Sequence, residues 1–187
     1  MVTYATLVYF YALSFYFQVK PVIVGVIVTL IFTGTFLLPA VAAVLILRIG
    51  RIRSLEMTEK QERNWPLVQT AIIYSACYYV FDSEIFQPFI RVFILGALFG
   101  MVAALFINLF RKISLHMIGT GGLCGGVAGL MISGEVGSSS LLLAACFILA
   151  GLVGTSRLQL GAHNPRELFA GFFVGFGVEF LVMVFLL

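Results

Sequence analysis

The feature that most constrains this chain is a series of apolar runs that are too long for the interior of a small soluble domain. Of its 187 residues, 61% are hydrophobic and 10% are charged, and the mean hydropathy is +1.12. A soluble domain of this size exposes many residues to water and cannot bury so much apolar side chain. A helix that crosses a bilayer needs about 20 apolar residues. The sequence therefore predicts an integral membrane protein whose main partner is the lipid bilayer.

Seven apolar runs have a length that fits a membrane span. They are Val2–Phe17, Pro21–Leu47, Pro66–Phe81, Pro88–Phe110, Ser114–Ser133, Ser140–Ser156 and Pro165–Leu187. Barrel strands are about ten residues long and alternate in polarity, so these runs can only be helices. We expect an all-α, polytopic transmembrane helix bundle of six to seven spans that forms one domain over residues 1–187. Pro39 inside the second run predicts a kink or a tilt.

Glycines recur at four-residue spacing in the fifth run. Gly121, Gly125 and Gly129 share one helix face, and Gly171 and Gly175 repeat the pattern on the last run. Small residues in this arrangement let a second helix backbone come close. We interpret the face as a helix-packing surface, and the alternative is close approach to a substrate tail. Whether the packing is within one chain or between copies stays open, and so does the oligomeric state.

Counting spans places three loops on one side of the membrane: Arg48–Trp65, Arg111–Lys112 and Arg157–Asn164. These loops and their flanks hold nine of the eleven Lys and Arg residues, and only Lys20 and Arg91 lie near the other side. The excess of positive charge predicts that the loops are cytoplasmic. The net charge of +3 is small and scattered, which argues against a nucleic-acid partner.

The only two histidines, His116 and His163, lie at the ends of different spans. Two antiparallel spans separate them, so the chain returns to the same membrane face and the two side chains can meet. Each has a hydroxyl and a cation nearby in sequence. Cations neutralise a phosphate group, one neutral imidazole can attack phosphorus, and a protonated imidazole can protonate the leaving oxygen. Glu167, four residues after His163, can orient its ring.

These residues resemble two signatures of the type 2 phosphatidic acid phosphatase superfamily. Ser156-Arg157, five residues, His163, three residues and Glu167 resemble the third signature, which reads Ser-Arg, five residues, His, three residues, Asp. Ser114-Leu115-His116 is similar to the core of the second signature, Pro-Ser-Gly-His. The similarity covers most of the chain from about Thr29 onward and is to a branch of small bacterial membrane proteins.

The resemblance implies a phosphatidic acid phosphatase/haloperoxidase-like core over about residues 54–180, in a bacterial cytoplasmic membrane. It implies that His163 is the nucleophile that forms a phosphohistidine, that Glu167 orients it, and that His116 is the general acid. The implied substrate is a lipid or polyprenyl phosphate or diphosphate. No cofactor and no metal are expected. The residues expected to bind phosphate are Arg157, Ser114, Lys112, Arg63, Lys60 and Ser156.

The chain departs from the family pattern at several positions. Glu167 replaces the usual Asp, and Ile113 and Leu115 replace the Pro and Gly of the second signature. The first signature, Lys, six residues, Arg-Pro, is not present as such. Its nearest equivalents are Lys60, Arg63 and Pro66, two spans before Ser114. We expect Lys112 to take over part of that role, with Arg63 as a second candidate.

Each candidate residue also has a purely structural interpretation. Asn164, Pro165 and Glu167 form the pattern of a helix cap, and Ser114 fits the cap of the fifth span. Cations at helix ends, here Arg157, Arg111 and Arg166, often anchor a helix at the headgroups. We interpret Glu179, within the last span, as an acid near the far headgroups. The three cysteines show no paired spacing, and we expect no disulfide.

Two functional alternatives stay open from the sequence. A lipid phosphotransferase would use the same residues, with a second hydroxyl in place of water. A non-catalytic transporter or scaffold of the same fold is favoured by Leu115 and by the missing first signature, although no internal repeat favours transport.

Overall fold

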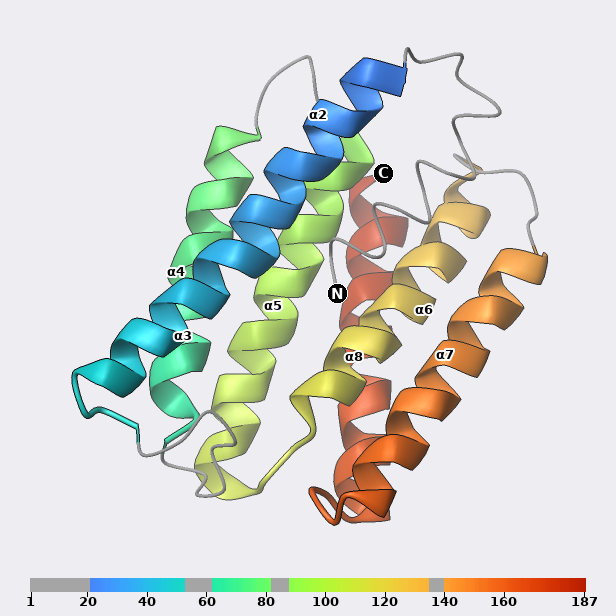
Figure 1. The fold of residues 1–187 in the computed structure, drawn as a ribbon. Helices are drawn as coiled ribbons and strands as arrows, with labels where there is room; N and C mark the ends of the chain where they lie inside the picture. Colours follow the sequence, from blue (N-terminus) through green and yellow to red (C-terminus); the bar gives the residue numbers. More distant parts are fainter. Residues whose placement is uncertain (1–20, 53–61, 82–87, 135–139) are drawn as a thin grey trace.

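The computed structural model describes residues 21–52, 62–81, 88–134 and 140–187, and every element in these ranges is helical (Figure 1). The all-α prediction is therefore confirmed for this part of the chain. The elements are α2 (Pro21–Phe32), the π-helical segment η1 (Thr33–Leu37), α3 (Leu38–Arg48), α4 (Asn64–Val80), α5 (Pro88–Phe110), α6 (Leu115–Ser133), α7 (Ser140–Gln159) and α8 (Pro165–Leu186).

Five helices in the described ranges are long and apolar enough to cross a membrane: 25–48, 88–110, 115–133, 140–159 and 165–186. These helices support a multi-pass membrane protein. The predicted third span corresponds to α4, which has 17 residues and is shorter than those five. The predicted first span, Val2–Phe17, lies outside the described residues, so the count of six to seven spans stays a prediction.

The helix in the second predicted span changes form just before Pro39. Proline has no N–H to donate to the carbonyl four residues earlier, and its ring crowds that carbonyl. Here the helix opens into η1, and the Tyr74 hydroxyl of α4 donates to the Thr35 carbonyl oxygen at 3.1 Å. Gln69 of α4 donates to the Pro39 carbonyl oxygen at 3.2 Å. Side chains of a neighbouring helix thus donate hydrogen bonds to carbonyl oxygens of this irregular turn. Such partners are needed in a bilayer interior, where no water can supply them.

The glycine face of α6 packs against α8, which confirms the helix-packing interpretation. A Cβ atom on Gly121 would collide with the Phe172 carbonyl oxygen, and one on Gly125 would collide with that of Phe176. In the other direction, a Cβ on Gly175 would collide with the Ile118 carbonyl oxygen. The two backbones lie so close that only glycine fits at these crossings. This contact fixes the start of α6 beside the start of α8.

Helix ends far apart in sequence gather at one end of the bundle. In Figure 1, the end of α3, the start of α4, the turn from α5 to α6 and the turn from α7 to α8 all lie at the lower end. This arrangement matches the sidedness deduced by counting spans. One boundary prediction was wrong: α7 continues beyond Ser156 to Gln159, and the chain turns at Gly161 with a φ of +61°. Nothing in 156–159 disfavours a helix, so Arg157 lies in its last turn.

Candidate functional site

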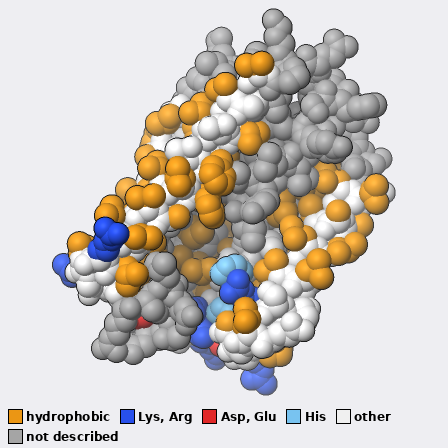
Figure 2. Space-filling model, in the orientation of Figure 1, with side chains coloured by type: hydrophobic (Ala, Val, Ile, Leu, Met, Phe, Trp, Pro, Cys, Tyr) orange, Lys and Arg blue, Asp and Glu red, His pale blue; other side chains and the backbone are white. Residues whose placement is uncertain are grey.

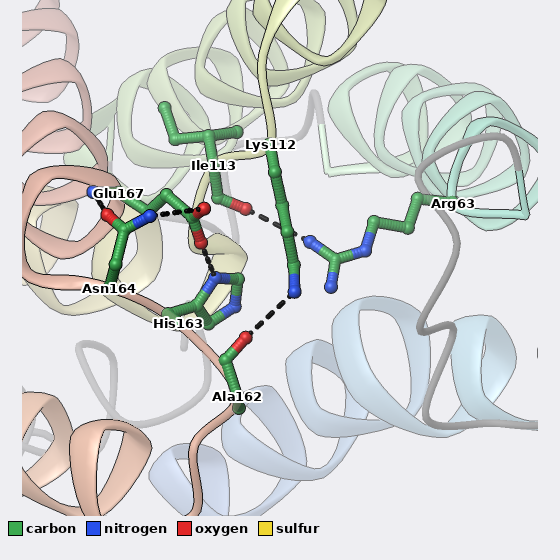
Figure 3. Close-up of polar contacts among 7 residues, drawn as sticks. All are labelled: Arg63, Lys112, Ile113, Ala162, His163, Asn164 and Glu167. Carbon is green, nitrogen blue, oxygen red and sulfur yellow. Dashed lines mark hydrogen bonds and ion pairs between the residues drawn. The ribbon is translucent and has the colours of Figure 1, made fainter.

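The centre of the candidate site is a contact between His163 and Glu167 at the start of α8. His163 Nδ1 lies 2.7 Å from Glu167 Oε2. Asn164 caps the helix, because its side-chain oxygen accepts from the Glu167 N–H at 3.0 Å. Its amide also donates to Glu167 Oε1 at 2.8 Å. Capping and orientation of the histidine therefore occur together, and both carboxylate oxygens are occupied (Figure 3).

This contact determines which nitrogen of His163 is available. A carboxylate only accepts, so Nδ1 carries the proton and donates to Glu167, which leaves the Nε2 lone pair free in the neutral ring. The side chain of His163 is 6% exposed. Burial lowers the pKa of His163; the hydrogen bond to Glu167 opposes this shift, and the charges of Arg63 and Lys112 reinforce it. A neutral imidazole is the form that a nucleophile needs.

Two cations from other elements reach the same place. Lys112, in the turn between α5 and α6, donates from Nζ to the Ala162 carbonyl oxygen at 2.9 Å, directly before His163. Arg63, just before α4, donates to the Ile113 carbonyl oxygen at 3.2 Å. Burial lowers the pKa of Arg63, and the negative charge of Glu167 partly restores it. Figure 3 shows both cationic groups extending from separate segments of the chain toward the His163 ring.

Ser114 occupies the cap position of α6 but its side chain does not cap the helix. Its backbone is extended and its hydroxyl makes no cap hydrogen bond. The Oγ atom is fully buried and has no hydrogen-bond partner among the described residues. Its N–H donates to the Glu167 carbonyl oxygen at 3.4 Å, and a Cβ on Gly171 would lie 2.6 Å from the Ser114 carbonyl oxygen. The glycine packing thus joins the two signature segments.

His116 lies in the first turn of α6 with an exposed side chain. It is close enough to Arg157, His163 and Arg63 to interact with them electrostatically. Figure 2 shows pale-blue histidine atoms beside blue Lys and Arg atoms in a recess at the lower end of the molecule. The fold therefore matches the expectation that two spans return the second histidine to the first.

The remaining predicted phosphate-binding residues differ in their surroundings. The half-buried Arg157 has an Nε atom without a hydrogen-bond partner among the described residues. Ser156 donates its hydroxyl to the Val153 carbonyl oxygen at 2.9 Å, so that hydroxyl is already used within α7. Lys60 lies outside the described residues. Over 21–52, 62–81, 88–134 and 140–187, no three His, Cys, Asp or Glu side chains group as metal ligands would.

An apolar groove, which the sequence did not predict, adjoins this site. Its volume is about 340 Å³. It lies along α6, α7 and α8, and begins at Leu158 and Pro165 on either side of the loop that carries His163. Gly151 and Gly154 of α7 line it and keep it open. Their three-residue spacing was the available signal in the sequence, but it is common in membrane helices.

Comparisons with known proteins assign no family to the chain. No protein-family model, no curated protein and no solved structure matches it. A function for this protein is therefore inferred from the geometry of the site and from the resemblance of its signatures.

Proposed function

We propose that this protein is an integral membrane phosphatase that removes a terminal phosphate from a lipid or polyprenyl phosphate or diphosphate. The observation that carries the proposal is the 2.7 Å contact between His163 Nδ1 and Glu167 Oε2, made beside two cations and a second histidine. A histidine held in this tautomer presents a nucleophilic nitrogen. Lys112, Arg63 and Arg157 supply the charge that a phosphate requires.

The proposed reaction has two steps. His163 Nε2 donates its lone pair to phosphorus, the bond from phosphorus to the leaving oxygen breaks, and protonated His116 gives its proton to that oxygen. Water then attacks the phosphohistidine and gives a proton to His116, and the phosphorus–nitrogen bond breaks to release inorganic phosphate. Glu167 stabilises the positive charge on the His163 ring in each transition state. The chain supplies every proton-transfer group that the cycle needs.

The groove along α6, α7 and α8 supports a lipid as the substrate. Its lining is dominated by apolar side chains, including Met117, Phe147, Leu168 and Phe172. A tail seated there would leave its headgroup at the loop between α7 and α8, where His163 lies.

The test is inorganic phosphate release by the purified protein in detergent. Phosphatidic acid, lysophosphatidic acid, a polyprenyl phosphate and a polyprenyl diphosphate form the panel. We expect activity on at least one of them, loss of activity in His163→Ala and a strong decrease in His116→Ala. Inorganic phosphate as the product distinguishes hydrolysis from transfer to a second alcohol.

Arg48→Ala is the matched control, because Arg48 is an exposed cation at the same end of the bundle. It should keep wild-type activity. Wild-type protein that is inactive on the whole panel, or His163→Ala protein that keeps full activity, would show the proposal to be wrong.

A further inference from the structure

A second ionisable group on α8, Glu179, lies inside the bundle. Its side chain is 2% exposed. Its Oε1 atom is buried and has no hydrogen-bond partner among the described residues. The sequence interpretation placed Glu179 near the far headgroups, and the structure shows in addition that the side chain faces the neighbouring helices α5 and α6. An unpaired carboxylate in an apolar interior is costly, so such a group is kept neutral by a proton or is paired with a cation.

Glycines on both neighbouring helices make room for this carboxyl group. A Cβ on Gly96 of α5 would lie 2.6 Å from both carboxyl oxygens. A Cβ on Gly126 of α6 would lie 3.2 Å from Glu179 Cγ, and one on Gly122 would lie 3.7 Å from Oε2. These three glycines therefore leave the space that the carboxyl group occupies. Because glycine has no side chain, none of them gives Glu179 a hydrogen-bonding side-chain partner.

The carboxyl group lines a cavity of about 100 Å³ between α4, α5, α6 and α8. The lining contains two aromatic side chains, Tyr74 and Phe93, and otherwise small or apolar residues. Among the residues that the structure describes, the lining contains no Lys or Arg. Tyr74 donates its hydroxyl proton to the Thr35 carbonyl oxygen, so that proton does not neutralise Glu179. One acid, two aromatic rings and no base make a site whose charge is complementary to a single positive charge.

We propose that this cavity binds a small primary alkylammonium ion, with its charged group on Glu179 and its alkyl group against the apolar lining. Aromatic faces attract cations, and a carboxylate accepts from an ammonium group. An inorganic metal ion would require several oxygen ligands, and within the described part of the chain the lining offers side-chain oxygens only from Glu179 and Tyr74. A cavity of about 150 Å³ holds the six heavy atoms of benzene, so this one accommodates about four, as in propylammonium.

This site is separate from the phosphatase site and does not depend on the proposed function. On α6 the cavity lies against the face that carries Leu115, Ile118 and Gly122, whereas the exposed His116 lies off that face. Glu179 is twelve positions after Glu167, about 18 Å along the same helix.

The test is labelling of Glu179 by dicyclohexylcarbodiimide, which reacts with protonated carboxyl groups in apolar surroundings. The purified full-length protein is labelled in detergent with propylammonium chloride, sodium chloride of equal ionic strength, or propanol, and the modified residue is identified by mass spectrometry. With the amine at about ten times its Kd, the loss of unmodified Glu179, with the N-acylurea and the propylamide counted together, should slow about tenfold. Sodium chloride and propanol should have no such effect.

Two glycine variants provide a matched pair. Gly122→Ala adds a methyl group in ordinary contact with Glu179 Oε2, so it should fold, occupy part of the cavity and weaken protection by propylammonium. Gly177→Ala adds the same group on α8 where no atom lies within 4 Å, and it should behave as wild type. A thermal shift with propylammonium should occur in wild type and disappear in Glu179→Gln.

Three results would overturn the proposal. They are the absence of labelling at Glu179, equal protection by sodium chloride or propanol, and a thermal shift that persists in Glu179→Gln. Protection in Gly122→Ala equal to that in Gly177→Ala would show that the amine binds elsewhere.

Discussion

The two glutamates of α8, Glu167 and Glu179, have the same side chain but different surroundings. Glu167, in the first turn, contacts His163 and Asn164 with its two carboxylate oxygens, and its own N–H is capped. Glu179, deep in the helix, has no hydrogen bond from any described residue to its buried Oε1. The comparison shows that two identical side chains on one helix have different surroundings: the first carboxylate is held by two partners, and the second has a buried oxygen without a described partner.

The cause of the difference is local. Glu167 follows Asn164 and Pro165 at a helix start, where unpaired N–H groups favour an acid and polar neighbours are available. Glu179 faces glycines on two other helices, and no described cation pairs with it. The same substitution at the two positions should therefore have different effects.

The largest expected effect is on catalysis by Glu167→Gln. A glutamine can present its NH₂ group to His163 Nδ1 and thereby stabilise the wrong tautomer, for which a fall in kcat of about 10⁴-fold is typical. Glu167 raises the pKa of His163 against the effect of burial, so its loss should lower that pKa further. The acid limb of kcat/KM should then move to lower pH. Glu179→Gln should stay within about twofold of wild type, and an equal loss in both variants would remove the distinction.

The next effect concerns the cation beside His163. Lys112→Ala removes the hydrogen bond to Ala162 and one positive charge from the site. A charged hydrogen bond from Lys112 to the substrate phosphate, as proposed, would contribute about 1.5–3 kcal/mol, so kcat/KM should fall about ten- to hundredfold. Arg111→Ala is the control, because Arg111 is the exposed neighbour of Lys112. Equal activities of the two variants would mean that Lys112 acts only as a headgroup anchor.

A tenfold effect is expected from blocking the groove. Gly151 lines it, and a Cβ added at this position would have no atom within 4 Å, so Gly151→Phe should fold and cover the groove. Losing about ten atom contacts with the tail, each worth about 0.1–0.2 kcal/mol, should raise KM for a long-chain substrate about tenfold. KM for a short, water-soluble phosphate should not change. Gly177→Phe, equally unobstructed but outside the groove, should leave both values unchanged.

The smallest effect is on stability. Glu179→Leu replaces an unpaired buried acid with an apolar side chain of similar size, so the free energy of unfolding should increase by about 1 kcal/mol. Glu167→Leu should decrease it by a similar amount or more, because the contacts with His163 and Asn164 are lost. Unfolding in detergent would measure both. A decrease in Glu179→Leu would indicate that Glu179 already has a partner.

Much of the fold could be predicted from the sequence, because an apolar run of about 20 residues can cross a bilayer only as a helix. The helix bounds of α5 and α6 and the presence of a glycine packing face depend on length and residue size alone, whereas the structure identified α8 as the partner of that face. The pairing of His163 with Glu167 was also foreseeable, because Glu167 is the third helical residue and its side chain reaches back toward the cap, where His163 precedes Asn164. The helical form of 156–159 was missed because the predicted span ended with the apolar run at Ser156, although no residue in 156–159 breaks a helix.

Other features could not be predicted from the sequence, because they depend on how helices that are distant in the sequence pack together. The surroundings of Glu179 depend on Gly96 and Gly122 from two other helices, and no periodicity within α8 reveals them. Arg63 reaches the site through the Ile113 carbonyl oxygen, fifty positions away. A capping role for Ser114 was plausible from its position, yet its hydroxyl makes no cap hydrogen bond.

The measurement that tests the central claim most directly is detection of the phosphohistidine. The protein is mixed briefly with a lipid that carries a radiolabelled terminal phosphate, denatured in base, and digested for mass spectrometry. The proposal predicts a base-stable, acid-labile label on His163 that is absent from His163→Ala. Phosphate release without any such label, or a label on another residue that persists in His163→Ala, would contradict it.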